Sequence, residues 1–128
     1  MELNKVTGEI VSSAIKVHAA LGPGLLESAY RTCLGHELLH RQLRVQTEVV
    51  QPISYDGLIL DAGYRLDLLV NDAVIVELKV VEKLLPVHHS QLLSYLRLSR
   101  RPVGLLINFN TWRLTDGIKR VVNSFNTT

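Results

Sequence analysis

Apolar positions along the chain follow two spacings, one typical of helices and one typical of strands. Residues 4–20, residues 26–42 and a segment that begins at Pro86 carry apolar side chains three and four positions apart, which predicts amphipathic helices. The sequence LGPGL, residues 21–25, separates the first two helices. Residues 103–109, VGLLINF, are apolar at nearly every position, which predicts a strand buried on both faces.

The middle of the chain carries a strand pattern. Residues 44–55 alternate apolar and polar side chains, a period of two that is typical of a half-buried strand. The dipeptide Asp56-Gly57 is a strong hairpin turn that leads into the next segment. Residues 64–81, YRLDLLVNDAVIVELKVV, predict two further strands joined by a tight turn at Asn71 and Asp72.

The two apolar sets of the hairpin at residues 64–81 determine how its strands pair. Every second position is apolar before the turn and again after it, so each set lies on one face of its strand. If both sets face the core, the facing pairs are Val70 with Val74, Leu68 with Val76, and Leu66 with Leu78. This register requires a three-residue loop or a bulge, because a two-residue loop would send the two sets to opposite faces. It also places Asp67 directly across from Glu77.

Asp67 and Glu77 are thus predicted to be like charges that face each other on a mostly apolar surface. Such a pair destabilises two paired strands, and little water is present to relieve it. Lys79 lies on the same face, but one ammonium opposite Arg65 is not enough to neutralise both carboxylates. A divalent cation with oxygen ligands would neutralise both, and a water held on it becomes a nucleophile at neutral pH.

The order of predicted elements indicates the fold class. Asp116-Gly117 predicts a short closing hairpin formed by residues 112–114 and 118–122. The chain then runs helix, helix, three or four strands, helix, strand, which predicts an α/β sandwich with a mixed sheet. At 128 residues, 14.4 kDa and 47% apolar content, residues 1–128 fit one domain with a single core.

Charge and cysteine content give only weak information on the binding partner and the cellular compartment. The net charge of +2 and a pI of about 8.9 are compatible with a polyanionic partner but do not predict one. Cys33 has no partner for an intrachain disulfide and no secretory leader is visible, so we expect a reducing, cytoplasmic environment. No apolar run approaches the roughly 20 residues that a membrane-spanning helix needs, so no membrane association is expected.

Three groups of residues resemble motifs of one nuclease superfamily. Asp67 followed by Glu77-Leu78-Lys79 has the form D…E-x-K on adjacent strands, which resembles the catalytic motif of the PD-(D/E)XK nuclease superfamily. Residues 24–30, GLLESAY, match G-x-x-E-x-x-Y, the signature of the GxxExxY family within that superfamily. Gln91 and Tyr95 form the Q-x-x-x-Y pair seen in exonuclease-type members.

The element order is also similar to the core of that superfamily. The resemblance therefore implies an α/β, restriction-endonuclease-like fold, in which helices flank a central mixed sheet in the order αα-βββ(β)-α-β. One departure is Leu66, which stands where the superfamily's half-motif has proline. This half-motif is loose across the superfamily, so the departure does not change the expectation.

What the resemblance implies is a Mg²⁺- or Mn²⁺-dependent nuclease acting on DNA, or on RNA. The implied metal ligands are Asp67, Glu77, the Leu78 carbonyl and Glu27. Lys79 would orient and polarise the attacking water or stabilise the developing negative charge. Gln91 and Tyr95, one helical turn apart, would orient the active site or contact the phosphate.

Simpler interpretations remain open for each group. Asp67, Glu77 and Lys79 could decorate an exposed hairpin face, although the apolar neighbours on that face imply burial. Glu27 could merely complement a helix N-terminus, and the Gln91 and Tyr95 side chains could merely pack. The same fold could also serve as a nucleic-acid-binding module without catalysis. Because so small a core leaves few side chains to grip a duplex, we expect a homodimer, formed through residues 103–109 or the closing hairpin.

A rival motif lies on the second predicted helix. His36-Glu37-Leu38-Leu39-His40 has the form H-E-x-x-H, in which two histidines one turn apart could bind zinc and the glutamate could act as a general base. A zinc peptidase would need a third ligand. The candidates are His18, His88 and His89.

Overall fold

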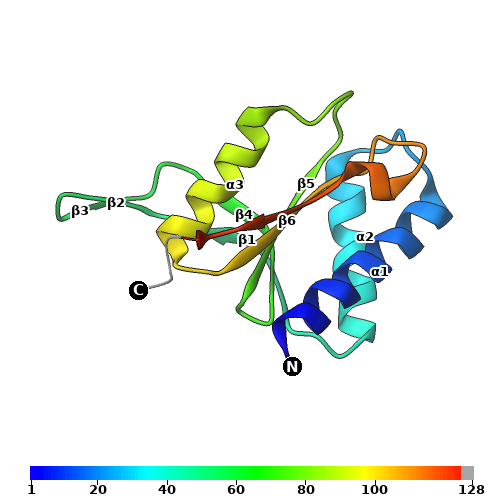
Figure 1. The fold of residues 1–128 in the computed structure, drawn as a ribbon, viewed down its shortest axis with the longest axis horizontal. Helices are drawn as coiled ribbons and strands as arrows, with labels where there is room; N and C mark the ends of the chain where they lie inside the picture. The colour runs from blue at the N-terminus through cyan, green and yellow to red at the C-terminus, as the bar shows by residue number, and fades with distance from the viewer. Residues whose placement is uncertain (125–128) are drawn as a thin grey trace.

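A five-stranded mixed sheet forms the centre of the protein, and the computed structural model describes residues 1–124 (Figure 1). The strand order is β1-β4-β5-β6-β7, with only β5 and β6 parallel. The bounds are Val45–Val50 for β1, Arg65–Val70 for β4, Val74–Lys79 for β5, Val103–Asn108 for β6 and Ile118–Val122 for β7. The parallel pair needs a crossover connection, which the helix α3 (Pro86–Ser99) supplies.

Helices cover both faces of this sheet. The helices α1 (Leu3–Leu21) and α2 (Glu27–His40) pack on one face, and α3 packs on the other (Figure 1). Each face therefore has its own apolar cluster, and β6 is buried along its whole length because both faces above it are covered. The predicted α/β class with a mixed sheet between helices is confirmed. Within residues 1–124, no helix is long and apolar enough to cross a membrane.

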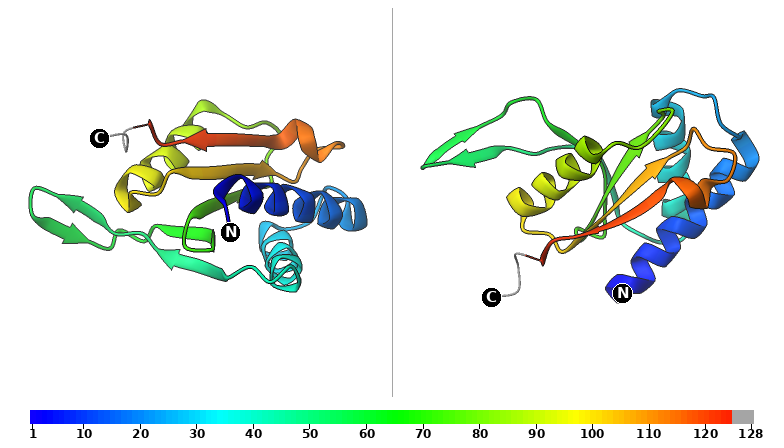
Figure 2. Two further views of the ribbon diagram at one scale, coloured as in Figure 1. Left: turned by 60° about the horizontal axis from the view of Figure 1, so that its bottom comes forward. Right: turned by 45° about the horizontal axis from the view of Figure 1, so that its top comes forward.

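The strands β2 (Ile53–Tyr55) and β3 (Leu58–Leu60) form a separate hairpin that projects from the body of the molecule (Figure 2). The predicted turn is present: Asp56 and Gly57 both have positive φ, as a two-residue turn of type I′ requires. The single strand predicted at residues 44–55 is divided into β1 and β2, since Gln51 and Pro52 lie between them in irregular backbone.

The end of the described chain differs from the prediction. Residues 114–117 form a short 3₁₀ helix, and β7 pairs with β6 instead of with residues 112–114. This arrangement satisfies the backbone groups along one side of β6, which a local hairpin would leave unpaired. Residues 103–108 consequently lie inside the sheet between β5 and β7, so the expectation that this segment forms a homodimer interface is wrong.

Candidate active site

The hairpin of β4 and β5 pairs as the apolar pattern predicts, but only near its turn. The facing pairs are Val70 with Val74, Leu69 with Ile75, and Leu68 with Val76. Asn71 and Asp72 have positive φ, and the Ala73 N–H donates to the Val70 carbonyl across a three-residue loop. Beyond the third pair the regular ladder ends, so the strands separate at the level of Asp67 and Glu77.

The neighbouring strand β1 is distorted at the same level. The pairs on either side of the distortion are Thr47 with Leu68 and Val49 with Leu66. Between them lie Glu48 and Asp67, and Glu48 has a φ of 50°, a left-handed conformation that interrupts a regular strand. Leu66 packs in the cluster under α3, while Leu78 packs under α1 and α2. The predicted pairing of Leu66 with Leu78 on one face is therefore wrong.

The side chains of Asp67 and Glu77 bridge the two strands where they separate. The Asp67 backbone N–H donates to Glu77 Oε2 at 2.8 Å, and the Leu78 N–H donates to Asp67 Oδ2 at 2.8 Å. Each carboxylate thus binds the backbone of the opposite strand in place of a ladder hydrogen bond. The structure brings the two predicted acids together, although they do not form a regular facing pair.

Burial makes this arrangement costly at neutral pH. Glu77 is only 4% exposed, and burial followed by the nearby Asp67 charge raises the pKa of Glu77 to about 8. Burial also raises the pKa of Asp67, although the Leu78 N–H and the Lys79 ammonium oppose the shift. A buried carboxylate resists ionisation because the protein solvates its charge poorly. The site therefore favours any positive group that can offset two acids.

Glu27 joins these acids from the first turn of α2. Its carboxyl donates a hydrogen bond to the Asp67 carboxylate, and burial followed by the Asp67 charge raises the pKa of Glu27. Tyr30, one turn later, is fully buried and stacks on Phe109 at 4.5 Å between ring centroids. The Tyr30 hydroxyl donates to the Gly22 carbonyl and accepts from the Leu25 N–H at 3.1 Å. Tyr30 thereby holds the loop that sets where α2 begins and where Glu27 points.

A Tyr30→Phe variant tests this role of the hydroxyl. It keeps the buried ring but leaves the Gly22 carbonyl and the Leu25 N–H without their partner, so we expect a loss of about 1–3 kcal/mol in the free energy of unfolding. Urea denaturation measures the loss, with Tyr55→Phe as the matched control because Tyr55 is 73% exposed. An equal stability of both variants would show that the hydroxyl does not hold the loop.

Lys79, Gln91 and Tyr95 complete the group on the α3 side of the sheet. The Lys79 Nζ donates to Gln91 Oε1 at 3.3 Å, which joins β5 to α3. Tyr95 is 5% exposed, and burial followed by the Glu77 charge raises the pKa of Tyr95 to about 12. The phenol therefore remains protonated at neutral pH and can serve as a hydrogen-bond donor.

Two further residues belong to this neighbourhood and were not predicted from the sequence. Arg31 lowers the pKa of both Glu27 and Asp67 through its charge, and it forms an ion pair with Glu48 at 3.5 Å. Its position one turn after Glu27 was the available signal. Tyr64 packs edge-on against Tyr95 at 5.9 Å between ring centroids. Tyr64 precedes β4, and no spacing in the sequence links it to α3.

A model of the PD-(D/E)XK nuclease superfamily matches residues 4–121 of the chain. The chain belongs to this superfamily. Its membership supports a hydrolytic nuclease with a nucleic-acid substrate, and nucleases of this superfamily generally use divalent metals. No curated protein and no solved structure matches the chain. Assignment to the GxxExxY family within the superfamily remains a prediction.

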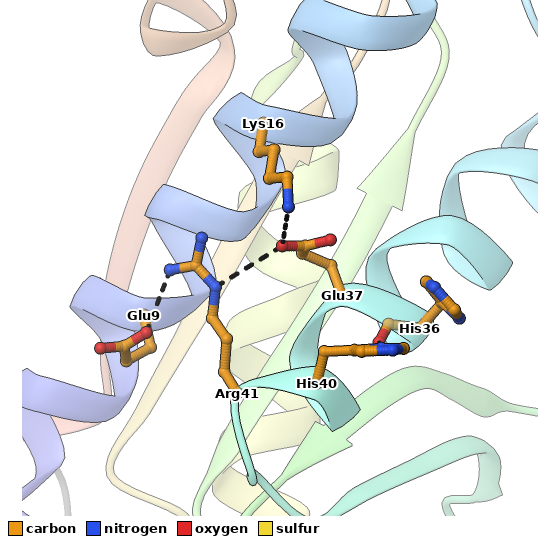
Figure 3. Close-up of polar contacts among 6 residues, drawn as sticks. All are labelled: Glu9, Lys16, His36, Glu37, His40 and Arg41. Atoms are coloured by element: carbon orange, nitrogen blue, oxygen red, sulfur yellow. Dashed lines mark hydrogen bonds and ion pairs between the residues drawn. The ribbon is translucent and has the colours of Figure 1, made fainter.

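The H-E-x-x-H motif lies away from the nuclease motif and is engaged in surface contacts. Glu37 forms ion pairs with Lys16 at 2.8 Å and Arg41 at 3.8 Å (Figure 3). The hydrogen bond from Lys16 lowers the pKa of Glu37, which makes Glu37 a weaker base. The His40 Nδ1 lies 2.9 Å from the His36 carbonyl oxygen.

The histidines proposed as a third zinc ligand have other surroundings. The His18 Nε2 lies 2.7 Å from the Thr111 carbonyl oxygen, and the His88 Nδ1 accepts from the Leu85 N–H at the start of α3. His89 also lies on α3, across the sheet from α2. These contacts argue against a zinc peptidase site.

The oxygen donors at the nuclease motif fit a hard divalent cation. Among residues 1–124, no three His, Cys, Asp or Glu side chains already form a group that could hold a metal ion. Mg²⁺ does not need such a cage, because proteins usually bind it through one or two carboxylates while it keeps several waters. Asp67 and Glu77 supply two carboxylates beside a backbone segment, and both resist ionisation until a cation compensates their charge. The donor set therefore suits Mg²⁺ or Mn²⁺ and not a softer metal.

Proposed function

We propose that the protein is a metal-dependent nuclease that hydrolyses phosphodiester bonds of DNA. The observation that carries the proposal is a pair of carboxylates, the buried Glu77 and the half-buried Asp67, at the point where β4 and β5 separate beside Lys79. Burial raises the pKa of both acids, and acids with pKa values shifted in this way are typical of functional sites. Mg²⁺ or Mn²⁺ would be held by Asp67, Glu77 and the Leu78 carbonyl, and Glu27 would hold its outer-shell waters.

The chain's own residues supply the remaining chemistry. When bound, the metal would neutralise charge on the phosphoryl group and make water nucleophilic near pH 7. Lys79 would hold the attacking water and place its ammonium near the charge that develops on the phosphoryl oxygens. Gln91 would fix the Lys79 ammonium through the hydrogen bond between them, and the protonated Tyr95 phenol would donate to a phosphate oxygen.

We further propose that the chain is a member of the GxxExxY family. The three fixed residues of that signature are Gly24, Glu27 and Tyr30. Gly24 has a φ of 105°, which is strained for any other residue, and Tyr30 holds the same loop by its hydroxyl. Both residues thus serve to place Glu27 against Asp67, which gives the signature a physical reason in this chain.

Cleavage of labelled DNA tests the proposed function. We expect hydrolysis of single- or double-stranded DNA with Mg²⁺ or Mn²⁺ and none in EDTA, and loss of activity in Asp67→Asn. Glu82→Gln is the matched control, since Glu82 is an exposed acid outside the site. DNA binding without turnover under either metal would point instead to a non-catalytic nucleic-acid-binding module. Equal cleavage by Asp67→Asn and wild type would overturn the assignment.

A further inference from the structure

A pocket of about 460 Å³ lies between α3 and the start of the projecting hairpin. Its wall on the hairpin side includes Ile53 of β2 and Tyr64, which precedes β4. Its wall on the helix side includes Ser90, Ser94 and Leu98, which follow one another along one face of α3. The volume lies within the range of about 300–1,000 Å³ that is usual for small-molecule sites.

This pocket opens directly beside the candidate active site. Gln91 and Tyr95 line the pocket and also belong to the site, since Gln91 binds Lys79 and the Tyr95 phenol lies near Glu77. A ligand with one group at Lys79 would therefore place its adjoining group in the pocket. In a nucleic acid, the group that adjoins a phosphate through the sugar is a base.

The lining has the chemistry that accepts a base. The Tyr64 ring is 40% exposed, and its edge-on contact with Tyr95 holds it in place. Ser90 and Ser94 present exposed hydroxyls, and Gln91 presents an amide, so the pocket offers donors and acceptors to a base edge. Apolar contacts from Ile53 and Leu98 complete the wall. Proteins bind unstacked bases by combining aromatic faces with such polar groups.

The charge of the hairpin argues for a base and against a phosphate in this pocket. Residues 50–64 contain two acids, Asp56 and Asp61, and no lysine or arginine. Binding of the phosphate backbone depends on lysine and arginine, which this wall does not supply. The part of a nucleic acid that suits the wall is therefore its uncharged base.

We propose that this pocket binds one unstacked nucleobase of a single-stranded nucleic acid whose adjoining phosphate lies at Lys79. The inference rests on the proposed function and narrows it, because a base stacked and paired within a duplex cannot enter the pocket. It assigns Tyr64 as the stacking platform. It makes single strands, or unpaired ends of duplexes, the preferred substrate class.

Fluorescence anisotropy with a labelled single-stranded DNA of twelve nucleotides tests the pocket. Ca²⁺ replaces Mg²⁺, and a gel verifies that the DNA remains intact during the measurement. We expect Tyr64→Ala to weaken binding about 5- to 150-fold, the range for loss of one aromatic stacking contact. Tyr64→Phe keeps the ring and is expected to bind within about 2-fold of wild type. Ser94→Trp fills the pocket from an exposed position on α3 and is expected to weaken binding as Tyr64→Ala does.

An abasic DNA of equal length separates base binding from phosphate binding. Wild-type protein is expected to bind it as weakly as Tyr64→Ala binds the ordinary strand. Equal affinity of the wild type for both strands would overturn the inference, as would full affinity in Ser94→Trp.

These outcomes are distinct from failure of the proposed nuclease function. Base-dependent binding without cleavage under any divalent metal would support the pocket and reject the nuclease. Metal-dependent cleavage would support the nuclease. If the DNA affinity is then the same for ordinary and abasic strands and for wild type and the pocket variants, the pocket is rejected.

Discussion

A Glu77→Gln variant is expected to lose nuclease activity and, at the same time, to gain stability. Activity should fall by about 10²–10³-fold or more, because the variant lacks one of the two carboxylates proposed to hold the metal. At pH values above neutral, the free energy of unfolding should be higher than in the wild type. The glutamine amide oxygen still accepts from the Asp67 N–H, but the buried charge is gone. The gain should be on the order of a few kcal/mol, since each unit of pKa shift is worth about 1.4 kcal/mol.

The pH dependence of that gain follows from the raised pKa of Glu77. In the folded protein this pKa is about 8, against an ordinary value of 4.5, so the protonated acid is the form that folding favours. Below about pH 4.5 Glu77 is protonated in both the folded and the unfolded protein, so it carries no penalty in the free energy of unfolding. The penalty grows as the pH rises from about 4.5 to about 8 and is complete above it.

Thermal unfolding in EDTA between pH 5 and pH 9 measures this difference. The midpoints of wild type and Glu77→Gln should lie close together at pH 5 and diverge toward pH 9, with the variant higher. Glu82→Gln should show no such divergence, because its side chain is exposed. A variant that is less stable than wild type at pH 9 would contradict the account of Glu77 as a costly buried charge.

A Lys79→Met variant is expected to be inactive for a different reason and to have the opposite effect on stability. Without the ammonium, the phosphoryl oxygens lose one of the two positive charges proposed to stabilise them, the metal being the other, and kcat should fall by about 10²–10³-fold. The Lys79 charge also lowers the pKa values of Glu27, Asp67 and Glu77. Its removal should therefore make the protein less stable at pH 8, where these acids ionise.

Single-turnover cleavage and urea denaturation at pH 8 measure the two effects of Lys79→Met. Lys83→Met is the matched control, since Lys83 is an exposed lysine just after β5. Activity retained within about 5-fold would remove Lys79 from the catalytic group. A stability gain equal to that of Glu77→Gln would show that Lys79 does not offset the acids.

Much of the fold could be predicted from the sequence because its local patterns agree with its packing. The three helices, the buried strand β6 and the hairpin turn of β4 and β5 all follow from periodicity and turn residues. The prediction of a closing hairpin was wrong because Asp116-Gly117 suits a 3₁₀ turn as well as a hairpin turn. The choice between them depends on the open edge of β6, which is a feature of the assembled sheet.

The candidate site was predictable in its members but not in its geometry. Alternation along β4 and β5 brings Asp67 and Glu77 together, but it assumes flat strands and so places Leu66 on the wrong face. The left-handed Glu48 on β1 changes the local geometry, and nothing in the period of two reveals it. Arg31 was missed because its influence on Asp67 depends on how α2 docks against the sheet.

Binding of Mn²⁺ at pH 7.5 tests most directly whether Asp67 and Glu77 hold one cation together. In isothermal titration calorimetry we expect one ion per chain, with a heat that changes between buffers of different ionisation enthalpy. The change reports release of protons, because burial and the nearby Asp67 charge raise the pKa of Glu77 and so favour its protonated form, whereas a metal ligand must be ionised. Glu77→Gln and Asp67→Asn should each lower the affinity for Mn²⁺ by about 10-fold or more. Wild-type affinity in both variants, or no binding to the wild type, would contradict the account.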